Sequence, residues 1–343
     1  MIEPQDLLER FTSTIKQAAK IFLAIAGVKK YRDQLISKIK HKNTLTPKQE
    51  NIIEICRKNN IERNKIFDSF YQSYITGIFH STYREALTSN KSRWEKYNYV
   101  IAGSDQIWNQ DIVGTWEALR FYYLYFVESS KRINYASSFG WCRRNSYIHK
   151  KGLNGFNKLS CREESGCDFI KKLTGRDAEL VLDPTLLLNA DEWRKIARKP
   201  DYDLPERYAL KYFFFTSESH QQVINQFAKN EKLEIIDIFD RKNKLHYCTG
   251  PQEFLYLVDH AEIILTGSFH GTAFSINFGK KFISFGENDT RIKSILSQLG
   301  IMNRLYCEGH DIPSGEINYQ EVNAKLDSMR ESSLKYLRDC LNV

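Results

Sequence analysis

Eight short apolar runs, five of which end at a glycine or a proline, alternate with helix-like stretches over most of this 343-residue chain. A first series of strand-like runs comprises residues 97–103, 132–140, 159–163 and 178–184. A second series comprises residues 207–215, 233–238, 262–267 and 281–286. Strands that alternate with helices favour parallel sheets with crossover connections, so this pattern predicts an α/β protein.

The two series of strands predict two α/β units that join near residues 189–203. A chain of this length also favours two domains of ordinary size over one. We therefore predict a mostly helical, basic N-terminal segment over residues 1–92, a first Rossmann-like domain over 93–190, and a second one with C-terminal helices over 191–343. Two doubly wound domains of this kind face each other across a cleft.

The composition excludes several classes of protein. Apolar residues make up 42% of the chain and aromatic residues 13%, which is enough for folded cores and argues against disorder. No run approaches the ~20 apolar residues that span a bilayer. No apolar N-terminal signal with a cleavage site is present, so we expect a cytoplasmic protein. The seven cysteines are scattered without a CxxC pair, so we expect free thiols.

The positive charge is concentrated in one segment. Residues 10–42 contain nine Lys or Arg residues and one acid, Asp33, which accounts for the whole net charge of +8. One interpretation of this helix-like segment is a solvated basic helix packed on a domain. The other is a surface helix attracted to anionic lipid at the inner face of the cytoplasmic membrane, or to a pyrophosphate-linked substrate. No nucleic-acid recognition motif accompanies the charge, so nucleic acid is not expected as a partner.

Small, polar and charged residues follow the predicted strands, where ligands of doubly wound sheets bind. The candidates are Gly103, Ser104, Asp105, Ser138, Arg162, Glu163, Glu164, Ser268, His270 and Gly271.

His270 lies in the first turn of a predicted helix, directly after a buried strand. Gly267 allows the chain to turn tightly there, and Ser268 is a suitable N-cap. Free backbone N–H groups and the helix dipole favour an anion at such a turn. The alternatives are structural: a buried histidine bonded to a loop carbonyl, an arginine at 162 that only forms a salt bridge, and a serine or aspartate at 104–105 that only caps a helix.

Five blocks resemble the polysaccharide pyruvyl transferase family, and they occur in the family's order. They are VIAGSDQIWN (100–109), INYASSFG (133–140), LSCREESG (159–166), VLDPTLLL (181–188) followed by Trp193, and LTGSFHGTAFSINFGKKFISFG (265–286). The resemblance implies a fold similar to the two-domain glycosyltransferases of the B type (GT-B). It also implies transfer of the enolpyruvyl unit of phosphoenolpyruvate to a hexose of a cell-surface polysaccharide, with formation of a pyruvate ketal and release of phosphate.

The resemblance implies roles for individual residues. His270 matches a histidine implicated in donor binding or proton transfer, and Arg162 matches an arginine that contacts phosphoenolpyruvate. Ser268 and Phe269 stand where some branches of the family carry an Arg-Leu pair. We therefore expect the donor to be bound by Arg162, Ser268, His270 and Gly271, with a large share from backbone N–H groups.

The acceptor, a lipid-linked oligosaccharide, is expected at Gly103, Ser104, Asp105 and Ser138. The general base is expected to be Asp105, Glu163 or Glu164, with protonated His270 as the acid. No metal and no cofactor are expected, since phosphoenolpyruvate is a substrate.

Two other functions stay open. One is a B-type glycosyltransferase that uses a nucleotide sugar. The other is a non-catalytic subunit of a polysaccharide assembly complex, because residues 1–8 lack the strand, glycine turn and helix with which many family members open.

Overall fold

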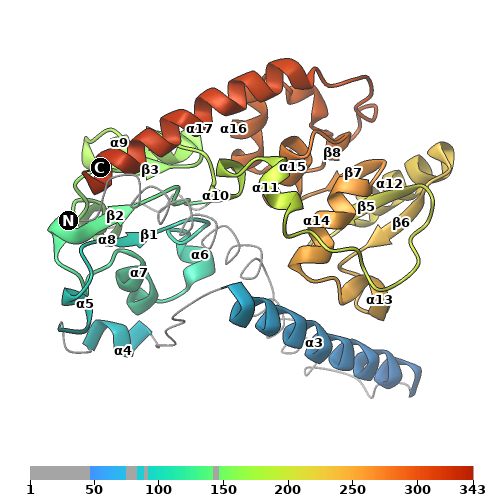
Figure 1. Ribbon diagram of the computed structural model, residues 1–343, viewed down its shortest axis with the longest axis horizontal. Coiled ribbons are helices and arrows are strands. Elements are labelled where there is room, and N and C mark those ends of the chain that lie inside the picture. The colour runs from blue at the N-terminus through green and yellow to red at the C-terminus, as the bar shows by residue number, and fades with distance from the viewer. Residues whose placement is uncertain (1–46, 75–82, 89–91, 142–146, 343) are drawn as a thin grey trace.

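The computed structural model describes residues 47–74, 83–88, 92–141 and 147–342 (Figure 1). In this part of the chain two groups of parallel strands alternate with helices. The basic segment 10–42 lies outside the described residues. Each cysteine that the structure describes is a free thiol.

The first group of strands is short and parallel. It consists of β1 (Val100–Ala102), β2 (Arg132–Asn134), β3 (Ser160–Cys161) and β4 (Glu179–Leu180). β1 pairs with β2 and β3 pairs with β4, and an isolated bridge between Ser137 and Cys161 connects the two pairs. The helices that follow these strands are α6 (Gln110–Val113), α7 (Trp116–Tyr122), η1 (Ser129–Lys131), α8 (Tyr147–Leu153), α9 (Glu164–Thr174), α10 (Pro184–Leu187) and α11 (Ala190–Arg194).

The second group forms a four-stranded parallel sheet in the order β6-β5-β7-β8. Its strands are β5 (Tyr208–Tyr212), β6 (Glu234–Asp237), β7 (Ile263–Thr266) and β8 (Phe282–Ser284). All five residues of β5 are buried, as expected for an inner strand of a parallel sheet with both faces covered. The helices are α12 (Glu218–Glu231), α13 (Lys244–Tyr247), α14 (Pro251–His260), α15 (Phe269–Asn277), α16 (Thr290–Leu299), η2 (Met302–Arg304) and α17 (Tyr319–Leu341).

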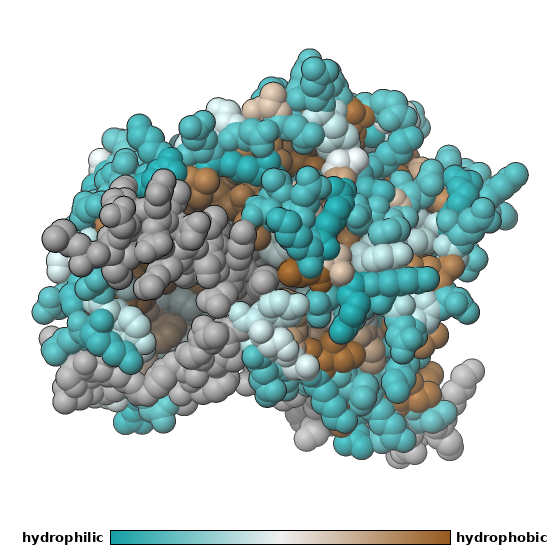
Figure 2. Space-filling model, viewed as in Figure 1, coloured by the Kyte–Doolittle hydropathy of each residue, from teal (hydrophilic) through white to brown (hydrophobic). Residues whose placement is uncertain are grey.

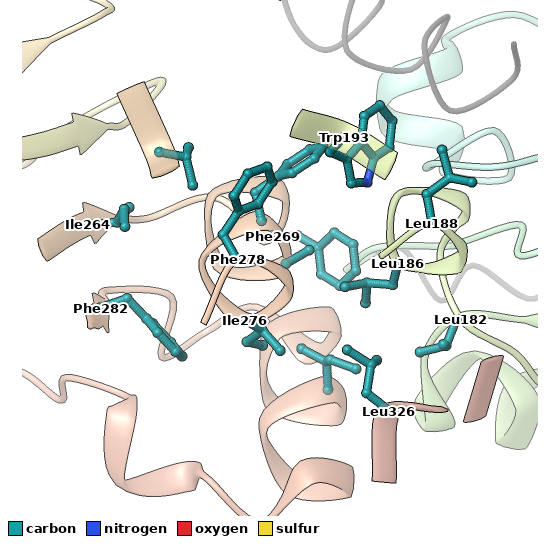
Figure 3. Packing of buried hydrophobic residues seen from close by; sticks show 14 of the residues in the cluster. Leu182, Leu186, Leu188, Trp193, Ile264, Phe269, Ile276, Phe278, Phe282 and Leu326 are labelled. Atoms are coloured by element: carbon teal, nitrogen blue, oxygen red, sulfur yellow. The ribbon is translucent and has the colours of Figure 1, made fainter. Parts of the chain in front are cut away.

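Helix α15 lies at the centre of the largest hydrophobic core, and all nine of its residues are buried. Figure 3 shows side chains from α10, α11, β7, β8 and α17 gathered around it. Gly271 permits this close packing, because a Cβ atom there would lie 2.1 Å from Thr266 Oγ1 of β7. A helix enclosed on all sides fixes the direction of the side chains in its first turn.

Helix α17 connects the two groups of strands, and in Figure 1 it runs from the first group to α16 of the second. Tyr336 donates its hydroxyl proton to the carbonyl oxygen of Asn134, which ends β2, at 3.0 Å. Arg330 donates to Leu186 O in α10 at 2.7 Å and to Asn277 Oδ1 in α15 at 2.9 Å. The C-terminal helix therefore holds the first group against the second.

Helix α3 (Pro47–Tyr74) packs against the second group of strands, below α13 and α14 in Figure 1. Arg63 is buried, donates to the carbonyl oxygens of Tyr247 and Ile238, and lies over the ring of Phe239. By contrast, α4 (Tyr83–Thr88) packs on α7 of the first group, where Tyr83 contacts Phe121. The described helices of the predicted N-terminal segment thus lie on both groups.

The structure confirms the α/β class and the parallel sheets. Each of the eight strands in the described residues falls inside one of the runs identified in the sequence. The facing-domain arrangement and the domain boundaries stay predictions. No helix among the described residues is long and apolar enough to cross a membrane. Hydrophilic side chains dominate the face shown in Figure 2.

The packing of α3 predicts unequal effects of two arginine substitutions on that helix. Arg63→Ala removes a cation from two buried carbonyl oxygens, so it should lower the free energy of unfolding by at least ~2 kcal/mol. Arg57→Ala removes only an exposed i,i+3 pair with Glu54 and should leave the free energy of unfolding close to that of the wild type. Urea unfolding of both variants measures the difference. Equal losses of the free energy of unfolding would contradict the packing of α3 against the second group of strands.

Candidate functional site

Arg162 lies at the centre of a buried cluster of charges at the carboxyl ends of the strands. Its side chain is 0% exposed, and its two terminal nitrogens bind different carboxylates. Nη1 lies 2.5 Å from Asp183 Oδ2, and Nη2 lies 2.7 Å from Asp105 Oδ1. The three residues follow β3, β4 and β1, so one guanidinium joins the ends of three strands.

His270 reaches the same cluster from the second group of strands. Its Nε2 lies 4.0 Å from Asp183 Oδ2, and its side chain is 8% exposed. Asp183 also accepts a hydrogen bond from Ser104 Oγ at 2.9 Å. Its other oxygen, Oδ1, accepts from the backbone N–H and the hydroxyl of Thr185, at 3.0 and 2.8 Å. Asp183 is therefore the shared acceptor of Arg162, Ser104 and Thr185.

A second arginine, Arg291, enters the site from the start of α16. Its Nε and Nη2 donate to Asp289 at 2.9 and 2.5 Å, and its Nη1 lies 3.8 Å from Asp105 Oδ1. The ring of Phe269 lies 4.6 Å from the Arg162 guanidinium carbon and 5.9 Å from that of Arg291. One aromatic ring thus lies beside two cations.

The backbone after β1 is shaped to bring Asp105 into the cluster. Gly103 has a φ of +142°, and a Cβ atom there would lie 1.8 Å from the carbonyl oxygen of Tyr135. Only glycine fits this conformation and this space. Asp105 itself has a φ of +68°, in the left-handed region that aspartate tolerates better than most residues.

Burial and neighbouring charges determine the protonation states. Burial alone would raise the pKa of Asp183, but the charge of Arg162 and the hydrogen bonds from Arg162 and Thr185 together lower that pKa to about 2. Burial would likewise raise the pKa of Asp105, but the combined charges of its neighbours, Arg162 first among them, lower it. Burial lowers the pKa of His270 to about 4 despite the nearby carboxylate of Asp183. With this pKa His270 is neutral at pH 7, so its predicted role as the acid needs a bound anion that raises the pKa.

The structure brings together only part of the predicted site. Asp105, Ser104, Arg162 and His270 meet, as described above. Glu163 lies nearby but is buried, and its Oε1 accepts from Ser138 Oγ at 2.9 Å and from the backbone N–H of Phe139 at 3.1 Å. Glu164 is exposed, and its backbone N–H donates to Ser294. Glu163 and Ser138 therefore bind each other, which leaves Asp105 as the candidate base inside the cluster.

The remaining predicted residues contribute to the site through their backbone conformation. Ser268 is the N-cap residue of α15, but its side chain makes no capping hydrogen bond. Thr266 Oγ1 instead accepts from the backbone N–H of Ser268 at 3.0 Å. Gly103 and Gly271 shape the turns that carry Asp105 and His270. Among the described residues, no group of three or more His, Cys, Asp or Glu side chains has the arrangement of a metal site.

The sequence placed Asp183 at the end of a predicted strand but gave it no role, and it missed two other members of the cluster, Asp289 and Arg291. The rule that pointed to strand ends could have found Asp289, which lies five residues after β8. Arg291 has a weaker signal, since it comes two residues later, in the first turn of α16. Its role depends on the fold of the loop before that helix.

A model of the family described as polysaccharide pyruvyl transferase matches residues 28–289, which is more than half of the chain. No curated protein matches the chain.

The neutral state of His270 predicts a loss of stability in mild acid. Burial also lowers the pKa of His149 to about 4. Between pH 6.5 and 4 the unfolded chain binds protons at both histidines and the folded chain does not, so stability falls as the pH falls. From pH 7.5 to 5 each histidine should remove about 2 kcal/mol.

Urea unfolding at the two pH values tests this expectation. His270→Gln should depend on pH less than the wild type by about 2 kcal/mol, because one of the two linked protons is gone. His260→Gln, at an exposed position on α14, is the matched control and should keep the wild-type dependence. An unchanged dependence in His270→Gln would mean that folding does not lower the pKa of His270, which would contradict its burial as a neutral imidazole.

Proposed function

Because the chain belongs to the polysaccharide pyruvyl transferase family, we propose that it transfers the enolpyruvyl group of phosphoenolpyruvate to a hexose. The acceptor in this proposal is a lipid-linked repeat unit of a cell-surface polysaccharide, and the products are a pyruvate ketal and phosphate. The observation that carries the proposal is the cluster of Arg162, Arg291, Asp105 and His270, which joins strand ends from both groups.

The donor requires cations and N–H donors, because phosphoenolpyruvate carries a carboxylate and a phosphate. Arg162 and Arg291 supply two guanidiniums, which bind planar anions in a bidentate manner. The first turn of α15 adds backbone N–H groups that lack partners inside the helix, together with the positive end of its dipole. We place the phosphate at this turn beside His270, where the arginine of other family branches is replaced by Ser268.

The reaction needs one acid and one base. Protonation of the methylene carbon turns it into a methyl group and leaves an oxocarbenium-like centre at C2, which a hexose hydroxyl attacks. A second hydroxyl then displaces phosphate from C2, and its proton leaves with the phosphate. His270 is the acid in this scheme, once a bound phosphate raises its pKa. Asp105 is the base, since it is ionised and 31% of its side-chain surface is exposed.

We further propose that the two groups of strands are the two facing domains of a B-type glycosyltransferase fold, with a boundary near residue 190. Support comes from the site itself, where residues after β1, β3 and β4 face residues after β7 and β8. A site between the carboxyl ends of two parallel sheets is where such folds bind their ligands.

Substitutions at His270 and Arg162 should abolish most of the turnover. His270→Gln removes the acid and should lower kcat by ~10²–10⁴. Arg162→Lys keeps the positive charge but loses the planar guanidinium, which can bind an anion through two parallel hydrogen bonds. Losing one charge-assisted contact costs ~1.5–3 kcal/mol, which lowers kcat/KM by about one to two decades. Lysine is preferable to alanine at 162, because alanine would leave two carboxylates without their cation.

The assay follows phosphate release and the pyruvyl mass increment on lipid-linked oligosaccharides, with phosphoenolpyruvate as donor. His260→Gln and Arg207→Lys, both at exposed positions, are the matched controls and should keep wild-type turnover. Wild-type turnover in folded His270→Gln would refute the role of that histidine. Consumption of a nucleotide sugar in place of phosphoenolpyruvate would instead establish a glycosyltransferase.

The basic segment 10–42 gives the proposal a second part, which is recruitment to a lipid-linked acceptor at an anionic membrane surface. Each basic residue near such a surface contributes ~1 kcal/mol, so a few engaged lysines are enough. We expect the protein to sediment with anionic vesicles and less with neutral ones, and salt should release it. A variant with Lys16, Lys20, Lys29 and Lys30 changed to Gln should bind less. Equal sedimentation of both proteins would show that the segment is only a solvated surface.

A further inference from the structure

A small cavity lies beside the charged cluster, between the loop after β2 and the loop that joins β8 to α16. Its volume is about 240 Å³. The side chains that decide its chemistry are Trp141, His220, Phe285, Glu287, Asn288 and Asp289. Trp141 comes from the first group of strands and the others from the second, so the cavity, like the cluster, lies between the two groups.

The lining combines an aromatic surface with hydroxyl-binding groups. Trp141 is 56% exposed, whereas Trp108 and Trp193 are fully buried. Glu287, Asn288 and Asp289 add carboxylate and amide groups on the opposite loop. An exposed ring beside such groups fits a ligand with one apolar face and a rim of hydroxyls, because the ring covers the apolar face while the polar groups exchange hydrogen bonds with the hydroxyls.

The volume restricts the ligand further. Pockets for drug-sized molecules measure ~300–1,000 Å³, so a cavity below that range accepts a single ring rather than a whole nucleotide sugar. A pyranose ring has the required size, apolar face and hydroxyl rim.

Asp289 connects the cavity to the charged cluster. It lines the cavity and also binds Arg291, whose Nη1 lies 3.8 Å from Asp105. A ring held in the cavity is therefore next to the residues that would bind the donor. By contrast, Ser104 and Ser138, which were expected to bind the acceptor, donate their hydroxyl protons to Asp183 and Glu163.

Ring packing and one hydrogen bond hold the walls of the cavity in place. Phe285 packs against His220 and Tyr306, with ring centroids 5.2 and 4.9 Å away. Thr290 Oγ1 donates to the carbonyl oxygen of Gly140 at 3.3 Å, which ties the loop that carries Trp141 to the start of α16. These contacts reduce the ordering that a ligand would have to impose on binding.

We propose that this cavity is the subsite for a pyranose ring of the acceptor, with Trp141 as its stacking surface and Asn288 and Glu287 as its hydroxyl partners. The identification of this pyranose as the acceptor rests on the proposed function, whereas the binding of a pyranose in the cavity does not.

Sugar binding can be measured without phosphoenolpyruvate, by titrating intrinsic tryptophan fluorescence with methyl glycosides of galactose, glucose, mannose and N-acetylglucosamine. Saturation-transfer NMR on the same samples gives an independent readout. At least one glycoside should saturate the fluorescence change of the wild type. Trp141→Ala should weaken its binding by about tenfold or more, as is common for a tryptophan at the centre of a binding site. Asn288→Ala should weaken it by a smaller factor.

Trp116→Ala is the matched control, because Trp116 is 48% exposed on α7 and does not line the cavity. It should bind the glycoside as the wild type does. The proposal is overturned if no glycoside binds, if Trp141→Ala binds as tightly as the control, or if UDP competes with the sugar at a hundredfold lower concentration, which would indicate a nucleotide site. If the glycoside binds through Trp141 and no phosphate is released from phosphoenolpyruvate, the cavity is a pyranose-binding site and the proposed transferase reaction is wrong.

Discussion

The buried ion pairs of Arg162 hold the site together. Its guanidinium is enclosed between Asp105 and Asp183, and no part of its side chain or that of Asp183 is exposed. Moving such charges out of water is costly, and the cost is recovered only where the geometry and the additional hydrogen bonds are good. Thr185 and Ser104 provide those bonds to Asp183. The ends of β1, β3 and β4 therefore depend on one cation for their arrangement.

Burial also determines the protonation state of His270. The histidine lies in the first turn of a helix that is enclosed on all sides, so its imidazole has lost most of its water, and this effect exceeds the attraction of Asp183. A histidine made neutral in this way can accept a proton when an anion arrives. Its pKa is set by the packing of α15, and Gly271 is part of that packing because it lets the helix approach β7.

The sequence was sufficient to predict the class of the fold and half of the cluster. Buried strands that end in glycine are a local pattern, and the rule for strand ends led to Asp105, Arg162 and His270. The partners of these residues could not be predicted in the same way. Whether Glu163 faces Arg162 or Ser138 depends on the path of the loop after β2, and the position of Arg291 depends on how α16 meets the first group of strands. Trp141 gave no pattern at all, since its exposure is a property of the folded surface.

The charges of the cluster place a condition on the binding of any anionic donor. Two guanidiniums, those of Arg162 and Arg291, face the three carboxylates of Asp105, Asp183 and Asp289. With His270 neutral, these six side chains carry a net single negative charge, which by itself repels phosphoenolpyruvate. Binding therefore requires a proton on His270 or the movement of a carboxylate away from its arginine. Asp105 is the most exposed of the three, so it is best placed to move toward solvent or toward an acceptor hydroxyl. Under the proposed mechanism, either response would give the cluster a charged acid and an accessible base, so the binding of the donor would prepare the site for proton transfer.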